Sequence, residues 1–169
     1  LVNEHSQLNF VSIKKDSIAE VHSFKKLSGS INKEGRVRFD ISLMSVETNI
    51  GIRNERMKKF LFETDKFQKA SFSANVDMAV LAALPPGNSS TMETQGLIDL
   101  HGRQQPVTFM AVINKNLNGD ITVGSLKPII VNASAFDLVA GINQLKTLAK
   151  LPNISVAVPV TFLLTFKTL

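Results

Sequence analysis

The sequence predicts an all-β protein, an antiparallel barrel of eight strands with two short helices laid against it. Apolar and polar residues alternate with period two over several segments, as they do in half-buried strands. The links between these segments carry turn-forming residues. The chain has 169 residues, of which 44% are hydrophobic, which suits one domain with one core. Eight such strands can close into a barrel without unpaired edges, so we expect residues 1–169 to form a single domain.

The first three strands are expected at residues 8–13, 24–31 and 37–43. The third shows the clearest alternation, because Phe39 and Leu43 belong to an apolar face and charged residues occupy the other face. A turn rich in Asn, Lys, Glu and Gly precedes it. We therefore expect this strand to have one buried and one solvated side.

Five further strands follow, separated by loops that contain Gly, Pro and Asn. The last of them is the longest, and Pro159 lies on its polar face. Because proline cannot donate to a strand ladder, we expect this strand to be at an edge, bulged there, or paired on its other side only. The five strands are expected at residues 70–76, 92–100, 107–113, 121–131 and 154–166.

Two segments follow helical periodicity instead. Residues 53–62 and 138–149 each place apolar side chains on one face and lysines on the other, and Pro152 ends the second run. We expect two short helices that cover the barrel. Residues 78–84 fit either a strand or a helix, and the alternative stays open.

The residue types that carry most enzymatic chemistry are missing or scattered. Cysteine is absent, and the three histidines lack the spacing of a metal site. His101 reads as a polar turn residue, and His22 next to Ser23 has no nucleophile elbow around it. Glycine-rich phosphate loops are also absent. We therefore expect no catalytic residues, no metal and no catalytic cofactor.

The net charge of +5 favours anionic partners in general, although a solvated basic surface is the simpler interpretation. Nucleic acid is not expected, because the chain has 11 Phe but no Trp or Tyr to act as exposed stacking platforms. The longest apolar stretch is too short for a membrane-spanning helix.

An apolar inner surface remains as the candidate site. Alternation alone does not tell whether these side chains fill the barrel or surround a ligand, since an eight-stranded barrel can do either. The strands contribute Phe10, Phe39, Leu43, Phe72, Phe109, Ile129, Val158, Phe162 and Leu164, and the covering segments contribute Phe60, Phe62, Phe136, Ile142 and Leu145.

Several stretches in a characteristic order resemble the YceI-like family of secreted bacterial isoprenoid-binding proteins. The order and spacing of the stretches carry the resemblance more than any single motif, and they extend over nearly the whole chain. The sequence departs from the family pattern at Asn54, at Phe67-Gln68 and at Asp137, and it lacks the usual early Trp or Tyr. The matching stretches are residues 6–10, 29–31, 37–43, 45–48, 53–57 running to Phe67, 70–72, 96–102 and Phe136.

The resemblance implies a lipocalin-like barrel whose tunnel holds a long isoprenoid chain, often the tail of a quinone such as ubiquinone. The inner surface would then be a binding wall, and the protein would bind, carry or store the lipid without catalysis. The resemblance also implies a periplasmic or secreted protein, and we expect that a signal peptide has been removed. The alternative is a structural or interaction domain of an exported complex with a filled core, and a small-molecule enzyme comes third.

One basic group gives this interpretation a second partner. Arg53, Arg56, Lys58 and Lys59 are close together on the first predicted helix and would help the protein to dock transiently on an anionic membrane surface. The sequence does not determine the oligomeric state, and a homodimer is compatible with it.

Overall fold

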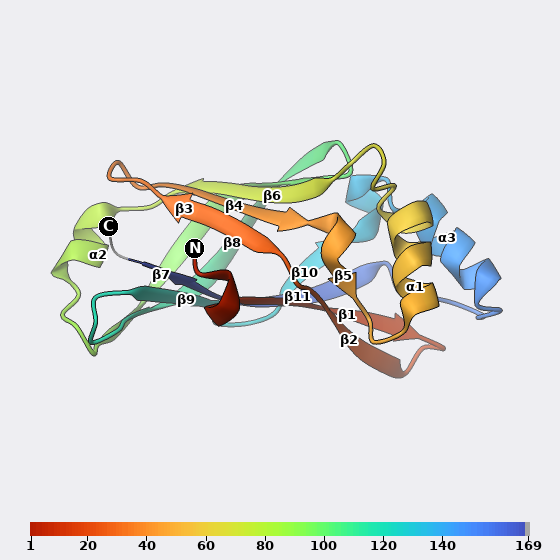
Figure 1. The fold of residues 1–169 in the computed structure, drawn as a ribbon, viewed down its shortest axis with the longest axis horizontal. Helices are drawn as coiled ribbons and strands as arrows, with labels where there is room; N and C mark the ends of the chain where they lie inside the picture. Colours follow the sequence, from red (N-terminus) through yellow and green to blue (C-terminus); the bar gives the residue numbers. More distant parts are fainter. Residues whose placement is uncertain (168–169) are drawn as a thin grey trace.

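A computed structural model describes residues 1–167 and confirms the all-β antiparallel class. One sheet curls into a half-barrel, with α1 and α3 at one end and α2 at the other (Figure 1). The strand order is β3-β4-β6-β7-β8-β9-β11-β1-β2-β5, and β10 pairs with β11 beside this path. The strands are β1 (Gln7–Lys14), β2 (Ile18–Phe24), β3 (Leu27–Ile31), β4 (Arg36–Ser42), β5 (Val46–Glu47), β6 (Lys69–Asn75), β7 (Ser89–Leu100), β8 (Arg103–Lys115), β9 (Ile121–Ser125), β10 (Ile129–Asn132) and β11 (Ala157–Phe166).

The described residues form eleven strands, where the sequence predicts eight. The largest difference is β2, which forms a hairpin with β1. Its pattern is inverted: Glu20, His22 and Phe24 alternate on one face, and Val21 on the other face is 63% exposed. Because polar residues occupy the side that apolar residues usually take, the alternation of hydrophobicity does not identify this strand.

A single expected strand at residues 121–131 is two strands, interrupted near Pro128. Both pair with β11, β9 along residues 163–166 and β10 along residues 157–160. On the other side of β11, the pairing with β1 covers residues 160–163 and does not include Pro159. This confirms one of the expected arrangements for Pro159, pairing on one side only.

The N-terminal residues tie together two strands that are not neighbours in the strand order. The amide of Leu27 at the start of β3 donates to Asn3 Oδ1 at 2.7 Å, and the amide of Val2 donates to the carbonyl of Thr165 in β11 at 2.7 Å. Residues 1–6 thus connect the β3 edge to β11 and help to hold the curl of the sheet.

Both predicted helices are present, and residues 78–84, which fit either a strand or a helix by sequence, contain a third. Helix α1 (Gly51–Arg56) continues into a π-helical turn at Met57–Leu61, and α3 spans Val139–Leu148. The third helix is α2 (Met78–Ala83), and the side chain of Asp77 caps its start by accepting a hydrogen bond from the amide of Ala79. Short 3-10 turns lie at η1 (Asn3–His5), η2 (Leu43–Ser45) and η4 (Ala133–Phe136). None of the helices within residues 1–167 has the length and apolarity required to cross a membrane.

Helix α3 approaches the π-helical turn closely through Gly141. A methyl group on this glycine would collide with the carbonyl oxygen of Phe60 and lie 2.8 Å from the Cα of Leu61. Only the lack of a side chain lets the two helical segments pack at this distance. This contact positions the helical end of the half-barrel.

We predict that Gly141→Ala lowers the free energy of unfolding by about 1–3 kcal/mol, because the added methyl group overpacks a backbone contact. Gly51→Ala is the matched control, since a Cβ there meets nothing within 4 Å and alanine favours a helix. Urea denaturation followed by circular dichroism measures both. Equal stabilities of the two variants would contradict this packing.

Candidate functional site

The interior of the half-barrel contains a cavity of about 240 Å³. Its lining includes Leu81 of α2 and Ile142 of α3. These two helices lie at opposite ends of the molecule (Figure 1). Among the described residues that line the cavity, only Ser71 and Thr94 have polar side chains. Dry apolar cavities of roughly 150 Å³ already bind small hydrocarbons in other proteins. The expectation of a filled core, which belonged to the alternative function, is therefore wrong.

Phenylalanine rings form two groups along this wall. Phe72, Phe109 and Phe162 contact in series, with ring centroids 5.7 and 5.6 Å apart. Phe10 and Phe24 make a second group, in which Phe24 also contacts Phe62 at 5.7 Å. Because phenylalanine has no hydrogen-bonding atom, these rings offer only apolar contacts. The rings therefore suit a hydrocarbon ligand.

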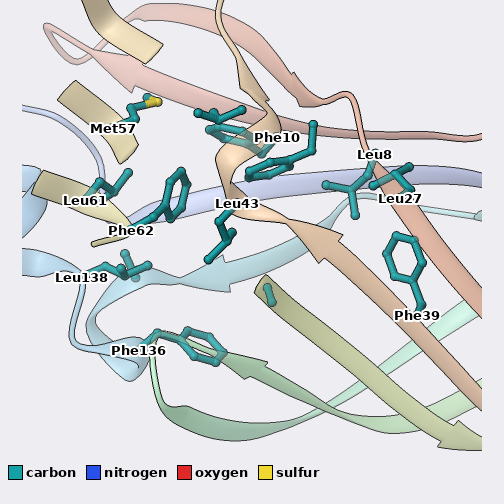
Figure 2. Close-up of a cluster of buried hydrophobic side chains, with 14 of the residues drawn as sticks. Leu8, Phe10, Leu27, Phe39, Leu43, Met57, Leu61, Phe62, Phe136 and Leu138 are labelled. Carbon is teal, nitrogen blue, oxygen red and sulfur yellow. The ribbon is translucent and has the colours of Figure 1, made fainter. Parts of the chain in front are cut away.

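Eleven of the fourteen residues proposed for the inner wall line this cavity. Those on strands point inward because alternate residues of a strand share a face, whereas Leu43, Phe62 and Ile142 come from turns and helices. Figure 2 shows Phe10 of β1, Leu43 of the 3-10 turn η2 and Phe62 of the helical end on one side of the buried cluster, with Phe39 of β4 on the other side. The eleven residues are Phe10, Phe39, Leu43, Phe62, Phe72, Phe109, Ile129, Ile142, Val158, Phe162 and Leu164.

The other three proposed wall residues lie elsewhere. Phe60 is half-buried, and the Lys59 amine lies 5.2 Å from the centroid of its ring. It does not line the main cavity, because the π-helical turn departs from the 3.6-residue spacing that predicted its position. Phe136 is buried in the core next to Leu138 but does not reach the cavity (Figure 2). Leu145 lines a second cavity.

The second cavity, of about 220 Å³, lies at the end where α1 and α3 pack against β1 and β2. The two cavities adjoin, because Phe10, Leu61, Ile142 and Val158 line both. Unlike the first, this cavity has charged and polar groups in its wall. They are Ser12, Lys14, Glu20, His22, Arg53, Arg56 and Ser155.

Glu20 is the centre of the ion pairs around the second cavity. It accepts from Lys14 at 2.8 Å and from Arg53 at 2.9 Å, and the hydrogen bond from Lys14, aided by Arg53, lowers the pKa of Glu20. Arg53 also donates to the carbonyl of Thr48 at 2.7 Å. His22 is 3% exposed, and its burial, with the nearby Arg53 charge, lowers its pKa, so the imidazole is neutral at pH 7.

Sequence reasoning did not identify Glu20 or His22 as part of a site. The available signal is the alternation in β2: Glu20 and His22 precede Phe24 by four and two residues, so they share a strand face with Phe24, which lines the main cavity. Polar residues in phase with a buried apolar one on a strand indicate an inward polar cluster.

The basic residues proposed for membrane docking have different surroundings. Arg53 is held by Glu20, and Lys58 pairs with Glu55 at 2.8 Å. Lys59 is exposed. Arg56 is half-buried and forms no ion pair with any described residue. The four cations therefore do not form one free surface.

The loop before α1 is anchored by Glu47. Its Oε1 accepts from the amide of Asn49 at 2.7 Å and from the side chain of Asn54 at 3.0 Å, and its Oε2 pairs with Lys25 at 2.6 Å. These donors, led by Lys25, lower the pKa of Glu47 to about 2. Asn54, where the sequence departs from the family pattern, thus orients the start of the helix beside the second cavity.

His101 lies in the turn between β7 and β8, with φ of 54°, as the sequence predicts. Its side chain contacts two other segments. Its Nε2 lies 2.9 Å from Glu63 Oε2, and its Nδ1 lies 3.1 Å from the carbonyl oxygen of Phe136. Within residues 1–167 no three His, Cys, Asp or Glu side chains gather as metal ligands would.

Comparison with known proteins agrees with this architecture. Residues 1–166 match the family model of the YceI-like domain. The chain belongs to the YceI-like family. A polyisoprenoid-binding domain from Saccharophagus degradans implicated in plant cell wall breakdown is 37% identical to this YceI-like protein, with a TM-score of 0.94 over 97% of this chain and 94% of that one.

Two more distant structures share the fold. Burkholderia cenocepacia BcnA is 17% identical, with a TM-score of 0.76 over 99% of both chains. A Campylobacter jejuni YceI protein is 15% identical, with a TM-score of 0.59 over 87% of this chain and 85% of that one. No curated protein matches the sequence.

We predict that Phe162→Glu lowers the free energy of unfolding by several kcal/mol, because it places a carboxylate without a partner in the apolar wall. Leu163→Glu is the matched control: its side chain points to the other face and is 47% exposed, so we expect a change within about 0.5 kcal/mol. Thermal unfolding of both variants tests this. Similar melting temperatures would show that the faces of β11 are reversed.

Proposed function

We propose that this YceI-like protein binds a long-chain isoprenoid lipid with its hydrocarbon tail in the main cavity. The observation that carries the proposal is the cavity itself, which runs between the two ends of the half-barrel and has an almost wholly apolar wall. The Saccharophagus domain, which is named for polyisoprenoid binding, supports the same ligand class. The wall of hydrocarbon groups and two hydroxyls favours a binding role without catalysis.

A role as carrier or store follows from the energetics of such a ligand. Burying roughly 40 tail carbons at ~0.8 kcal/mol each, relative to water, nominally exceeds ~30 kcal/mol. Measured affinities do not exceed about 18–21 kcal/mol, so water is the wrong reference state. The competitor is a bilayer, which is as apolar as the cavity, and the net preference for either is small. Loading and release at a membrane would then be reversible.

The specific ligand in this proposal is an isoprenoid quinone such as ubiquinone, or a polyprenyl lipid. The proposed location is the periplasm or the cell exterior, and the resemblance to a family of secreted bacterial proteins supports this proposal. In such a location the protein would take up its ligand from a membrane surface and hold it without water contact.

The helical end of the molecule is the proposed contact with the membrane. Ile50 and Ile52, at the start of α1, line the second cavity and are 46% and 61% exposed. Lys59 follows on the same helical segment and is also exposed. Exposed apolar side chains beside cations suit the interface of an anionic bilayer.

We predict that the purified protein carries an extractable isoprenoid. Because the chain has no Trp and no Tyr, it is nearly transparent where quinones absorb in the near ultraviolet. Expression in quinone-containing bacteria should give a strong band in this region, and mass spectrometry of an organic extract should identify the lipid. Native mass spectrometry that shows only the unliganded chain of 18.5 kDa would count against the proposal.

We also predict that Lys58→Ala/Lys59→Ala weakens association with anionic vesicles at low salt, by up to about 1 kcal/mol per charge. Lys33→Ala/Lys115→Ala removes the same charge from the opposite end, near α2, and should have little effect. Vesicle co-sedimentation measures both. Equal weakening would indicate attraction by net charge without a docking face.

A further inference from the structure

Two residues that line the second cavity, His22 and Arg53, each have a buried polar atom without a hydrogen-bond partner among the described residues. Nδ1 of His22 and Nε of Arg53 are buried and form no hydrogen bond with any described residue. A buried donor or acceptor without a partner is costly, and such atoms are rare in folded proteins. Both residues line the same cavity, so unsatisfied polar groups gather at one place in its wall.

Arg56 adds a third unsatisfied group to this wall. Its guanidinium has five N–H donors, is half-buried, and makes no hydrogen bond or ion pair within residues 1–167. Among the described residues of this wall, Glu20 has the only carboxylate, and Lys14 and Arg53 already engage it. The free groups are therefore chiefly donors, and the charge that remains is positive.

The position of these groups relative to the main cavity sets the geometry of a ligand. The two cavities share Phe10, Leu61, Ile142 and Val158, and the ring of His22 contacts that of Phe10 with a centroid distance of 5.3 Å. The polar wall of the second cavity therefore adjoins the apolar wall of the main cavity. A molecule with a hydrocarbon tail and a polar end can occupy both.

We propose that the second cavity holds the head group of the lipid, and that this head group has oxygen atoms that accept hydrogen bonds from Arg53, Arg56 and His22. The inference rests on the proposed function, because the tail must occupy the main cavity. The carbonyl oxygens of a quinone and the oxygens of a polyprenyl phosphate share this chemistry. A hydrocarbon without a head group leaves all three donors unsatisfied.

Arg56→Met tests the inference, because it removes donors that have no partner in the protein and so leaves no protein group unpaired. Arg36→Met, in β4 near the opposite end, is the matched control, since Arg36 forms only an exposed pair with Glu34. Uptake of three lipids from neutral phosphatidylcholine vesicles is compared: ubiquinone, a polyprenyl phosphate and squalene, an isoprenoid hydrocarbon. Gel filtration, extraction and mass spectrometry measure the lipid bound.

The expected result is a loss of about tenfold or more in the affinity of Arg56→Met for at least one of the two oxygen-bearing lipids, with squalene unchanged. The lipid that suffers the loss identifies the head group as quinone or phosphate. His22→Phe, which keeps the ring contact with Phe10 but removes both nitrogens, should reproduce the pattern and serves if Arg56→Met folds poorly.

An equal loss for all three lipids, or no loss for any, would overturn the head-group assignment and leave the tail cavity intact. Failure of the wild-type protein to take up any lipid would instead reject the proposed function, and the head-group assignment with it. The two failures are therefore distinguishable in the same experiment.

Discussion

The structure depends on the pairing of β11 along both of its edges. On one edge it pairs with β9 and β10, and on the other with β1, so this strand holds together the two halves of the curled sheet. Its alternation then places Val158, Phe162 and Leu164 on the same inner wall. The seam is reinforced by residues 1–6, which connect β11 to β3.

A hollow interior is expensive for a protein of this size. At roughly 24 cal/mol per Å³, an empty cavity of about 240 Å³ costs on the order of 6 kcal/mol, comparable with the whole stability of a typical domain. The buried side chains that offset this cost include Leu43, Met57 and Phe62 (Figure 2). A ligand that fills the main cavity would restore the lost contacts and add to stability.

The sequence predicted the main cavity wall better than the polar wall beside it. Strand residues such as Phe72 and Phe109 lie where their alternation puts them, because the direction of a strand side chain follows from its parity. Helical residues were less predictable: Phe60 belongs to a π-helical turn, and Leu145 faces the second cavity. His22 was missed because its strand carries polar side chains on the inner face.

The sequence by itself determined the antiparallel class, most strand positions and the apolar character of the inner face, since these depend on local periodicity. Only the tertiary structure decided that the interior is hollow, that Arg53 forms an ion pair with Glu20, and that His22 and Arg56 line the second cavity. The physical reason is that periodicity sets the direction in which a side chain points. The distance to the opposite wall depends on how the whole sheet curls, and no local pattern contains it.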